Sequence, residues 1–229
     1  DVSLNPKLFE RIKAVYNKHR ELTPEENKLL EESYDGFVRS GALLNENDKE
    51  KLRKLTEEAS LLALKFSQNV LKENKAYKLH ITNEEKLEGL PDSIREAAAT
   101  TAKEQGVDGW IFTLDAPSYG PFLIYSTQRD LRKELYMAHN TLCIKANSEN
   151  NIEVCKRLVN LRREMAQLLG YDTYADFVMK YRMASNVKNV YTLLDKLIDA
   201  YKPTAIEEYN ELCSIAKEQE GNNFKLMPW

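Results

Sequence analysis

The chain has 229 residues, with 33 lysines and arginines against 36 aspartates and glutamates, so its formal net charge of −3 gives no electrostatic case for binding nucleic acid or an anionic membrane. Hydrophobic residues make up 42% and charged residues 30%, a composition that excludes a disordered chain and fits a globular protein with a sizeable core. There are only 8 glycines and 7 prolines, so few turns are available and long helices are predicted.

Three helices are predicted in the first 74 residues. An N-cap followed by proline, Asn5-Pro6, opens the first, and its residues at helical spacing are Leu8, Ile12, Val15 and His19. A capping box with proline in its first turn, Thr23-Pro24-Glu25-Glu26, opens the second, which ends at Ser40-Gly41, so the two helices form a hairpin. From Asn45 to Asn74 apolar residues recur by threes and fours, which predicts a third helix about 45 Å long at 1.5 Å per residue.

Between residues 75 and 126 the pattern becomes that of a small sheet. Apolar residues alternate with polar ones, as on one face of a strand, at Tyr77, Leu79 and Ile81. Two short apolar runs, 110–114 and 122–125, are separated by the turn-rich stretch 115–121. This arrangement predicts that the two runs pair as antiparallel strands, giving a sheet of two or three strands.

The other predicted elements are helices. One runs over 91–105, between the first strand and the other two. Four more begin at Thr127, Ser148, Thr173 and Asn186. The last continues to Gly221 and is bent at Pro203, because proline removes one helix hydrogen bond. The prediction is therefore a mainly α fold with a small antiparallel β-sheet, built as one helical domain over 1–229 with segments 1–74, 75–126 and 127–229.

Residue patterns for catalysis are scarce. The sequence has no glycine-rich phosphate loop, and its histidines, His19, His80 and His139, are too far apart for a His-Glu-x-x-His motif. His139 and Cys143 are four residues apart on one helix face and Cys155 follows near the next, so these three could hold zinc. A fourth ligand is missing and cysteine is commonly buried, so packing is the favoured interpretation for them and for Cys213. We predict no catalytic, cofactor-binding or metal-binding residue in this chain.

Cysteine content and apolar runs bear on location. Three cysteines, Cys143, Cys155 and Cys213, are too few and too far apart for a disulfide framework, which favours a reducing compartment and hence the cytoplasm. No apolar run approaches the roughly 18 residues that span a bilayer, and the first residues lack the layout of a signal peptide. Because the chain begins with aspartate, it is expected to be a processed product or an excised segment.

Two features suggest contacts beyond the chain's own core. The helices predicted over 45–74 and 186–217 carry apolar residues on more than one side, for instance Leu61 and Leu64 beside Leu62. The aromatic stretch 119–122 could line a peptide groove, although covering the core of the sheet is the commoner role of such residues. From the residues alone, a non-enzymatic helical scaffold or protein-interaction domain is a possible function.

Several stretches carry a family resemblance that extends over the whole chain. They are 4–13 (LNPKLFERIK), 37–42 (FVRSGA), 66–71 (FSQNVL), 125–132 (YSTQRDLR), 168–171 (LLGY), 174–178 (YADFV), 182–184 (RMA) and 224–229 (FKLMPW). In these stretches the chain resembles the N-terminal half of peptidyl-dipeptidases (dipeptidyl carboxypeptidases) in the thimet oligopeptidase and neurolysin family of zinc metallopeptidases. None of these stretches contains a catalytic motif, so the mechanism can be inferred only from the resemblance.

The resemblance implies a neurolysin-like multi-helical N-terminal region, part of a larger enzyme with two halves around a deep channel. In that family zinc is held by a His-Glu-x-x-His helix and a further glutamate, which this sequence lacks, so the expected zinc and catalytic residues belong to a C-terminal half outside the chain. The expected substrates are short peptides that lose C-terminal dipeptides. An oligopeptidase that cuts internal bonds is the alternative within the family.

Overall fold

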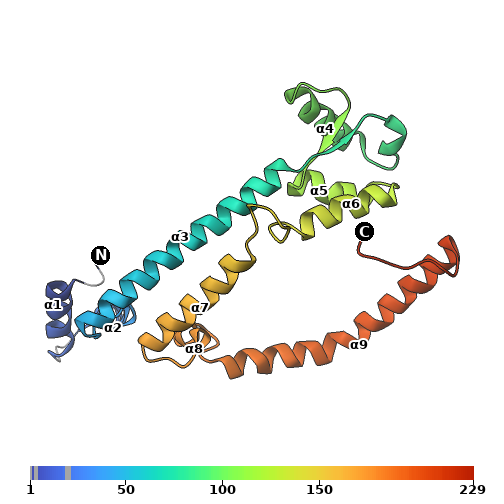
Figure 1. Ribbon diagram of the computed structural model, residues 1–229. Coiled ribbons are helices and arrows are strands. Elements are labelled where there is room, and N and C mark those ends of the chain that lie inside the picture. The colour runs from blue at the N-terminus through green and yellow to red at the C-terminus, as the bar shows by residue number, and fades with distance from the viewer. Residues whose placement is uncertain (1, 3–4, 19–21) are drawn as a thin grey trace. The chain divides into compact units, whose positions relative to one another are not determined.

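The structure, a computed structural model, describes residues 2, 5–18 and 22–229 (Figure 1). This part of the chain is mainly helical with one small two-stranded antiparallel sheet, which confirms the predicted fold class. It forms two compact units, Asp1–Ala63 with Lys156–Thr192 and Leu64–Cys155 with Leu193–Trp229. The sequence predicted one domain in three consecutive segments. Helical periodicity does not mark these boundaries, because both units draw residues from the same long helices.

The first unit begins with a helical hairpin. Helix α1 (Pro6–Tyr16) and helix α2 (Pro24–Arg39) open with the caps that the sequence predicted, since the side chain of Asn5 accepts hydrogen bonds in the first and Thr23 forms the capping box of the second. The buried ring of Phe9 stacks on Tyr34 and Phe37, with ring centroids 5.7 and 6.0 Å apart. His19, which the sequence placed on the first helix, lies outside the described residues.

The first unit also contains parts of two longer helices and one short helix. These are the N-terminal part of α3 (Glu46–Ala76), most of α7 (Ile152–Leu168) and all of α8 (Tyr174–Met179). Arg157 of α7 donates to both carboxylate oxygens of Glu58 on α3 at 2.6 Å, which fastens the two helices. The start predicted for α7 at Ser148 is wrong by four residues. Its hydroxyl donates to Glu149, whereas the side chain of Asn150 accepts from the N–H of Ile152 at the true start.

The second unit contains the sheet. Strand β1 (Leu79–Ile81) pairs antiparallel with β2 (Trp110–Phe112), with Leu79 opposite Phe112. Between the strands lie the short 3₁₀ helix η2 (Glu84–Leu87) and helix α4 (Asp92–Glu104), the latter close to the prediction. Helices α5 (Ala116–Tyr125) and α6 (Arg129–Asn140) follow β2.

The predicted hairpin between 110–114 and 122–125 is wrong. Residues 122–125 belong to helix α5, and β2 pairs with β1 instead. The stretch taken for a turn begins a helix, because Pro117 occupies the first turn, where a missing N–H leaves no helix bond unmade. Helix α6 also differs from its prediction, since it starts at Arg129 and Thr127 donates to Glu88 instead of capping it.

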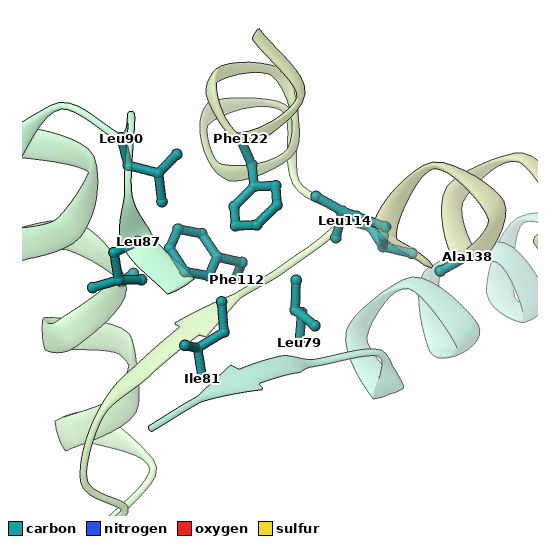
Figure 2. Close-up of a cluster of buried hydrophobic side chains, with 10 residues drawn as sticks. Leu79, Ile81, Leu87, Leu90, Phe112, Leu114, Phe122 and Ala138 are labelled. Carbon is teal, nitrogen blue, oxygen red and sulfur yellow. The ribbon is translucent and has the colours of Figure 1, made fainter. Parts of the chain in front are cut away.

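The core of the second unit lies between the sheet and helices α4, α5 and α6. Phe112 and Phe122 are fully buried and meet edge to face, with ring centroids 4.7 Å apart (Figure 2). Around them pack buried aliphatic residues, namely Leu79, Ile81, Leu87, Leu90, Ala98, Leu114, Leu135 and Ala138. The two aromatic rings therefore join the sheet to α5 at the centre of this cluster.

The last helix, α9 (Val187–Glu220), continues through Pro203. It ends just before Gly221, the residue at which the sequence predicted its end. After it, the chain returns to α6. Arg129 donates to the carbonyl oxygen of Lys225 at 2.8 Å and stacks 4.0 Å from the ring of Phe224, while Trp229 lies 5.6 Å from Tyr136. Within the described residues, no helix combines the length and apolarity needed to cross a membrane.

Candidate functional site

The predicted zinc candidates do not form a metal site. His139 on α6 stacks on Tyr119 with ring centroids 4.2 Å apart, Cys143 is buried in the following loop, and Cys155 is exposed on α7. In the described part of the chain, no three residues of the His, Cys, Asp and Glu types are grouped to hold a metal ion.

Cys143 is held by a buried carboxylate instead. Its backbone N–H donates to Glu73 on α3, and the same carboxylate pairs with Lys145 at 2.9 Å and accepts from Asn147 at 3.4 Å. Burial, aided by Glu73, raises the pKa of the Cys143 thiol to about 11. A thiol that stays protonated at neutral pH is a poor nucleophile, so Cys143 has a structural role.

The Glu73 carboxylate is the centre of this polar network. Its burial raises the pKa of the carboxyl group, but the hydrogen bonds from Lys145 and Cys143 outweigh that effect, so the pKa lies below its ordinary value. Cys143 adopts a left-handed backbone conformation with φ of 57°, which is uncommon outside glycine. Nearby, Asn151 donates to the carbonyl oxygen of Phe66 at 3.1 Å and accepts from Asn69 at 2.8 Å. These bonds fasten the loop after α6 to α3.

A second arrangement missed by sequence reasoning lies in the first unit. The Arg39 guanidinium at the end of α2 lies over the rings of Phe177 and Tyr181, 4.2 and 4.5 Å from their centroids. It also donates to the carbonyl oxygen of Phe177 at 3.0 Å. The stretches 37–42 and 174–178, both singled out by the resemblance, therefore meet here. Through these contacts Arg39 holds α8 against the end of α2.

The aromatic stretch 119–122 covers the core. Phe122 is fully buried, and Tyr119 is partly buried against the same cluster. The side chain of Asn140 lies 3.4 Å from the Tyr119 hydroxyl, and His139 covers its ring. The commoner interpretation is confirmed, because these side chains pack inward.

The largest unexplained feature is the surface of α9. None of its 34 residues is buried, although many are large and apolar. Those exposed by between 42% and 68% are Tyr191, Leu193, Leu194, Leu197, Ile198, Tyr201, Ile206, Tyr209, Leu212 and Ile215. We call these ten residues the α9 apolar surface. Cys213 beside it is half-buried, so core packing does not account for it. A helix that is apolar on several sides is normally covered in a larger assembly.

Comparisons with known proteins point to peptidases. The model of peptidase family M3 matches residues 122–229. Oligopeptidase A from Haemophilus influenzae is 34% identical over 208 residues, which are 89% of this chain and 30% of that protein. Dipeptidyl carboxypeptidase from Escherichia coli is 30% identical over 232 residues, covering 100% of this chain and 34% of that protein. Organellar oligopeptidase A from Arabidopsis thaliana is 34% identical over 205 residues, which are 86% of this chain and 26% of that protein. The chain thus spans about a third or less of the length of these curated relatives.

Proposed function

The chain belongs to peptidase family M3, and on that premise we propose that it forms a non-catalytic channel wall of a zinc metallopeptidase that hydrolyses short oligopeptides and releases their C-terminal dipeptides. The observation that carries the proposal is the similarity to peptidases along nearly the whole chain. The 229 residues contain no His-Glu-x-x-His motif. Zinc and the catalytic residues are therefore assigned to a C-terminal catalytic half of a longer protein, and this chain alone should not cleave peptides.

The partner proposed for the α9 apolar surface is that catalytic half. Burial of apolar area contributes about 25 cal/mol per Å², so leaving ten large side chains half-exposed is unfavourable unless another surface covers them. Helices α3 and α9 have 31 and 34 residues, and neither contains glycine. Helices of this length without glycine support a stiff wall that admits unfolded peptides and excludes folded proteins.

We predict that the 229-residue chain binds a hydrophobic dye through α9. Replacing Leu193 and Leu197 together by lysine should remove much of the dye fluorescence, because both side chains are exposed apolar groups. A matched control replaces Thr204 and Asn210, exposed polar residues of the same helix, by lysine. If the control lowers the fluorescence as much as the leucine variant, or the parent chain binds no dye, the α9 apolar surface is not an uncovered interface.

Peptide end-group dependence tests the proposed reaction. A peptidyl-dipeptidase must bind the C-terminal carboxylate of its substrate, so the full-length protein should release dipeptides from a free-acid peptide and lose most of its rate on the C-terminal amide. Product masses and rates for the two peptides give the answer. Equal cleavage of both at an internal bond would favour the oligopeptidase alternative, which relatives named oligopeptidase A support. If neither peptide is cleaved, the scaffold alternative is favoured.

The proposed location is the cytoplasm. Cys143, Cys155 and Cys213 are all free thiols, which fits a reducing compartment. No nucleic-acid or membrane partner is proposed, because the formal charge is −3.

A further inference from the structure

The outer edge of β1 has unpaired backbone groups. In an antiparallel pair, residues alternate between those that bond the partner strand and those whose N–H and C=O point away from it. In the register of the two strands, Thr113 lies opposite Lys78. The N–H of Thr113 donates to the Ser118 hydroxyl at 3.0 Å, so it does not bond the backbone of Lys78. The carbonyl oxygen of Ile81 points toward β2, since a Cβ on Gly109 would lie 2.4 Å from it. Leu79 and Ile81 therefore bond β2, and the backbone of His80 points outward.

Lys78 and Thr82 have the same parity as His80, so their backbone groups also face the outer edge. In the described part of the chain, neither residue makes a backbone hydrogen bond to another segment. Strand β2 also packs against α4 and α5. In the described part of the chain, the edge along residues 78–82 could pair with another extended chain.

A groove of about 440 Å³ runs along this edge. Its wall includes six consecutive residues, 78–83, and side chains of a strand point alternately to its two faces, so a cavity that touches every residue lies against the edge. The lining also includes Lys86, which follows β1, and Leu131 and Glu134 of α6. Because α6 lines the groove beside the edge, a single extended chain is the occupant that we consider.

The charges around the groove favour an acidic ligand. Lys78 and Lys86 are exposed, and within the described residues neither forms an ion pair. Glu134, which also lines the groove, accepts a hydrogen bond from the Tyr77 hydroxyl at 3.3 Å. A ring nitrogen of His80 lies 2.7 Å from the carbonyl oxygen of Asp108, so this side chain is also occupied. The lining thus carries two formal positive charges, on Lys78 and Lys86, against one negative charge, on Glu134. Carboxylates are the natural partners of the two exposed lysines.

We propose that the outer edge of β1 binds a short, extended, acidic peptide, which adds a third strand to the sheet while its carboxylates pair with Lys78 and Lys86. Strand addition at a sheet edge is a general way of binding peptides, with backbone bonds giving affinity and side-chain contacts giving selectivity. The choice of a peptide rests on the proposed function, for which peptides are the substrates. The groove would hold acidic peptide segments on this chain without any catalytic residue.

Edge lysines also have a protective role, since they discourage pairing between sheets. Binding experiments separate the two roles. The probe is a fluorescein-labelled Glu-Val-Glu-Val-Glu peptide, acetylated at its N-terminus and amidated at its C-terminus, titrated with the 229-residue chain and followed by anisotropy. Replacing Lys78 and Lys86 together by glutamate should weaken binding at least tenfold. The matched control makes the same change at Lys103 and Lys217, exposed lysines of the same unit outside the groove, and should bind the probe within about twofold of the parent chain.

Hydrogen exchange then tests strand addition itself. With the acidic probe bound, amide exchange should slow in residues 78–82. A basic control peptide, Lys-Val-Lys-Val-Lys, should give no such protection. Absence of binding, equal loss in the control variant, or binding without protection of 78–82 would each overturn the proposal. These measurements need no catalysis, so a failure here leaves the proposed peptidase function standing. Conversely, full-length protein that cleaves no peptide would not remove an observed strand addition.

Discussion

Replacing Phe122 by alanine is expected to lower the free energy of unfolding of the second unit by about 3–5 kcal/mol, the usual cost of deleting a buried aromatic side chain. Phe122 is fully buried, and it meets Phe112 edge to face at 4.7 Å. The substitution removes both the buried area and the ring contact, and it leaves a cavity between the sheet and α5. Urea unfolding followed by circular dichroism measures the loss.

Phe66 gives the matched control, because it is 37% exposed and lies outside this cluster. Phe66→Ala should cost much less than Phe122→Ala, since it removes a smaller buried area. The chain has two compact units, so each variant should be monitored by hydrogen exchange of the sheet as well as by the global transition. Equal losses in the two variants would contradict the assignment of Phe122 to the centre of the core.

Replacing Glu73 by alanine is expected to be the second most damaging change. It leaves the buried N–H of Cys143 without its acceptor, which costs about 1–3 kcal/mol. It also removes the partner of Lys145. Glu73→Gln keeps an acceptor oxygen and should recover part of the loss. Unfolding in urea at pH 7 measures both variants, and Glu96→Gln, an exposed position on α4, is the control.

Acid should weaken the Glu73 network. The pKa of Glu73 is lowered in the folded protein, so its contribution to stability is fully present above the ordinary pKa of 4.5 and is lost as pH falls through the lower folded value. Between pH 6 and pH 3 the parent chain should therefore lose more stability than the Glu73→Gln variant, which has no carboxyl group at this position. If parent and variant lose stability in parallel, Glu73 is not the titrating group of the network.

The helices were largely predictable because their signals are local. Asn5 and Thr23 cap α1 and α2 through residues two or three positions away, so the pattern is complete within one turn. The strand predicted at residues 122–125 was wrong because a short apolar run fits a strand or a helix equally well. The packing of Phe122 against Phe112, ten residues earlier, fixes that choice in the folded protein.

The polar arrangements could not be predicted, because they join residues far apart in the chain. Glu73 meets Cys143 across 70 residues, and Arg39 meets Phe177 across 138. Nothing near Glu73 in the sequence distinguishes it from the exposed glutamates of the same helix. The apolar excess of the last helix was visible in advance, since it depends on composition and spacing alone, and the exposure of α9 confirms it.

Selectivity for unfolded peptides is the most direct test of the channel-wall proposal. The full-length protein should be offered one cleavable sequence in two forms, as a short free peptide and within a surface loop of a stably folded protein. A wall built on α3 and α9 should admit the peptide and exclude the folded protein, so we expect hydrolysis of the first and at most traces with the second. Equal rates of cleavage in the two forms would contradict the account.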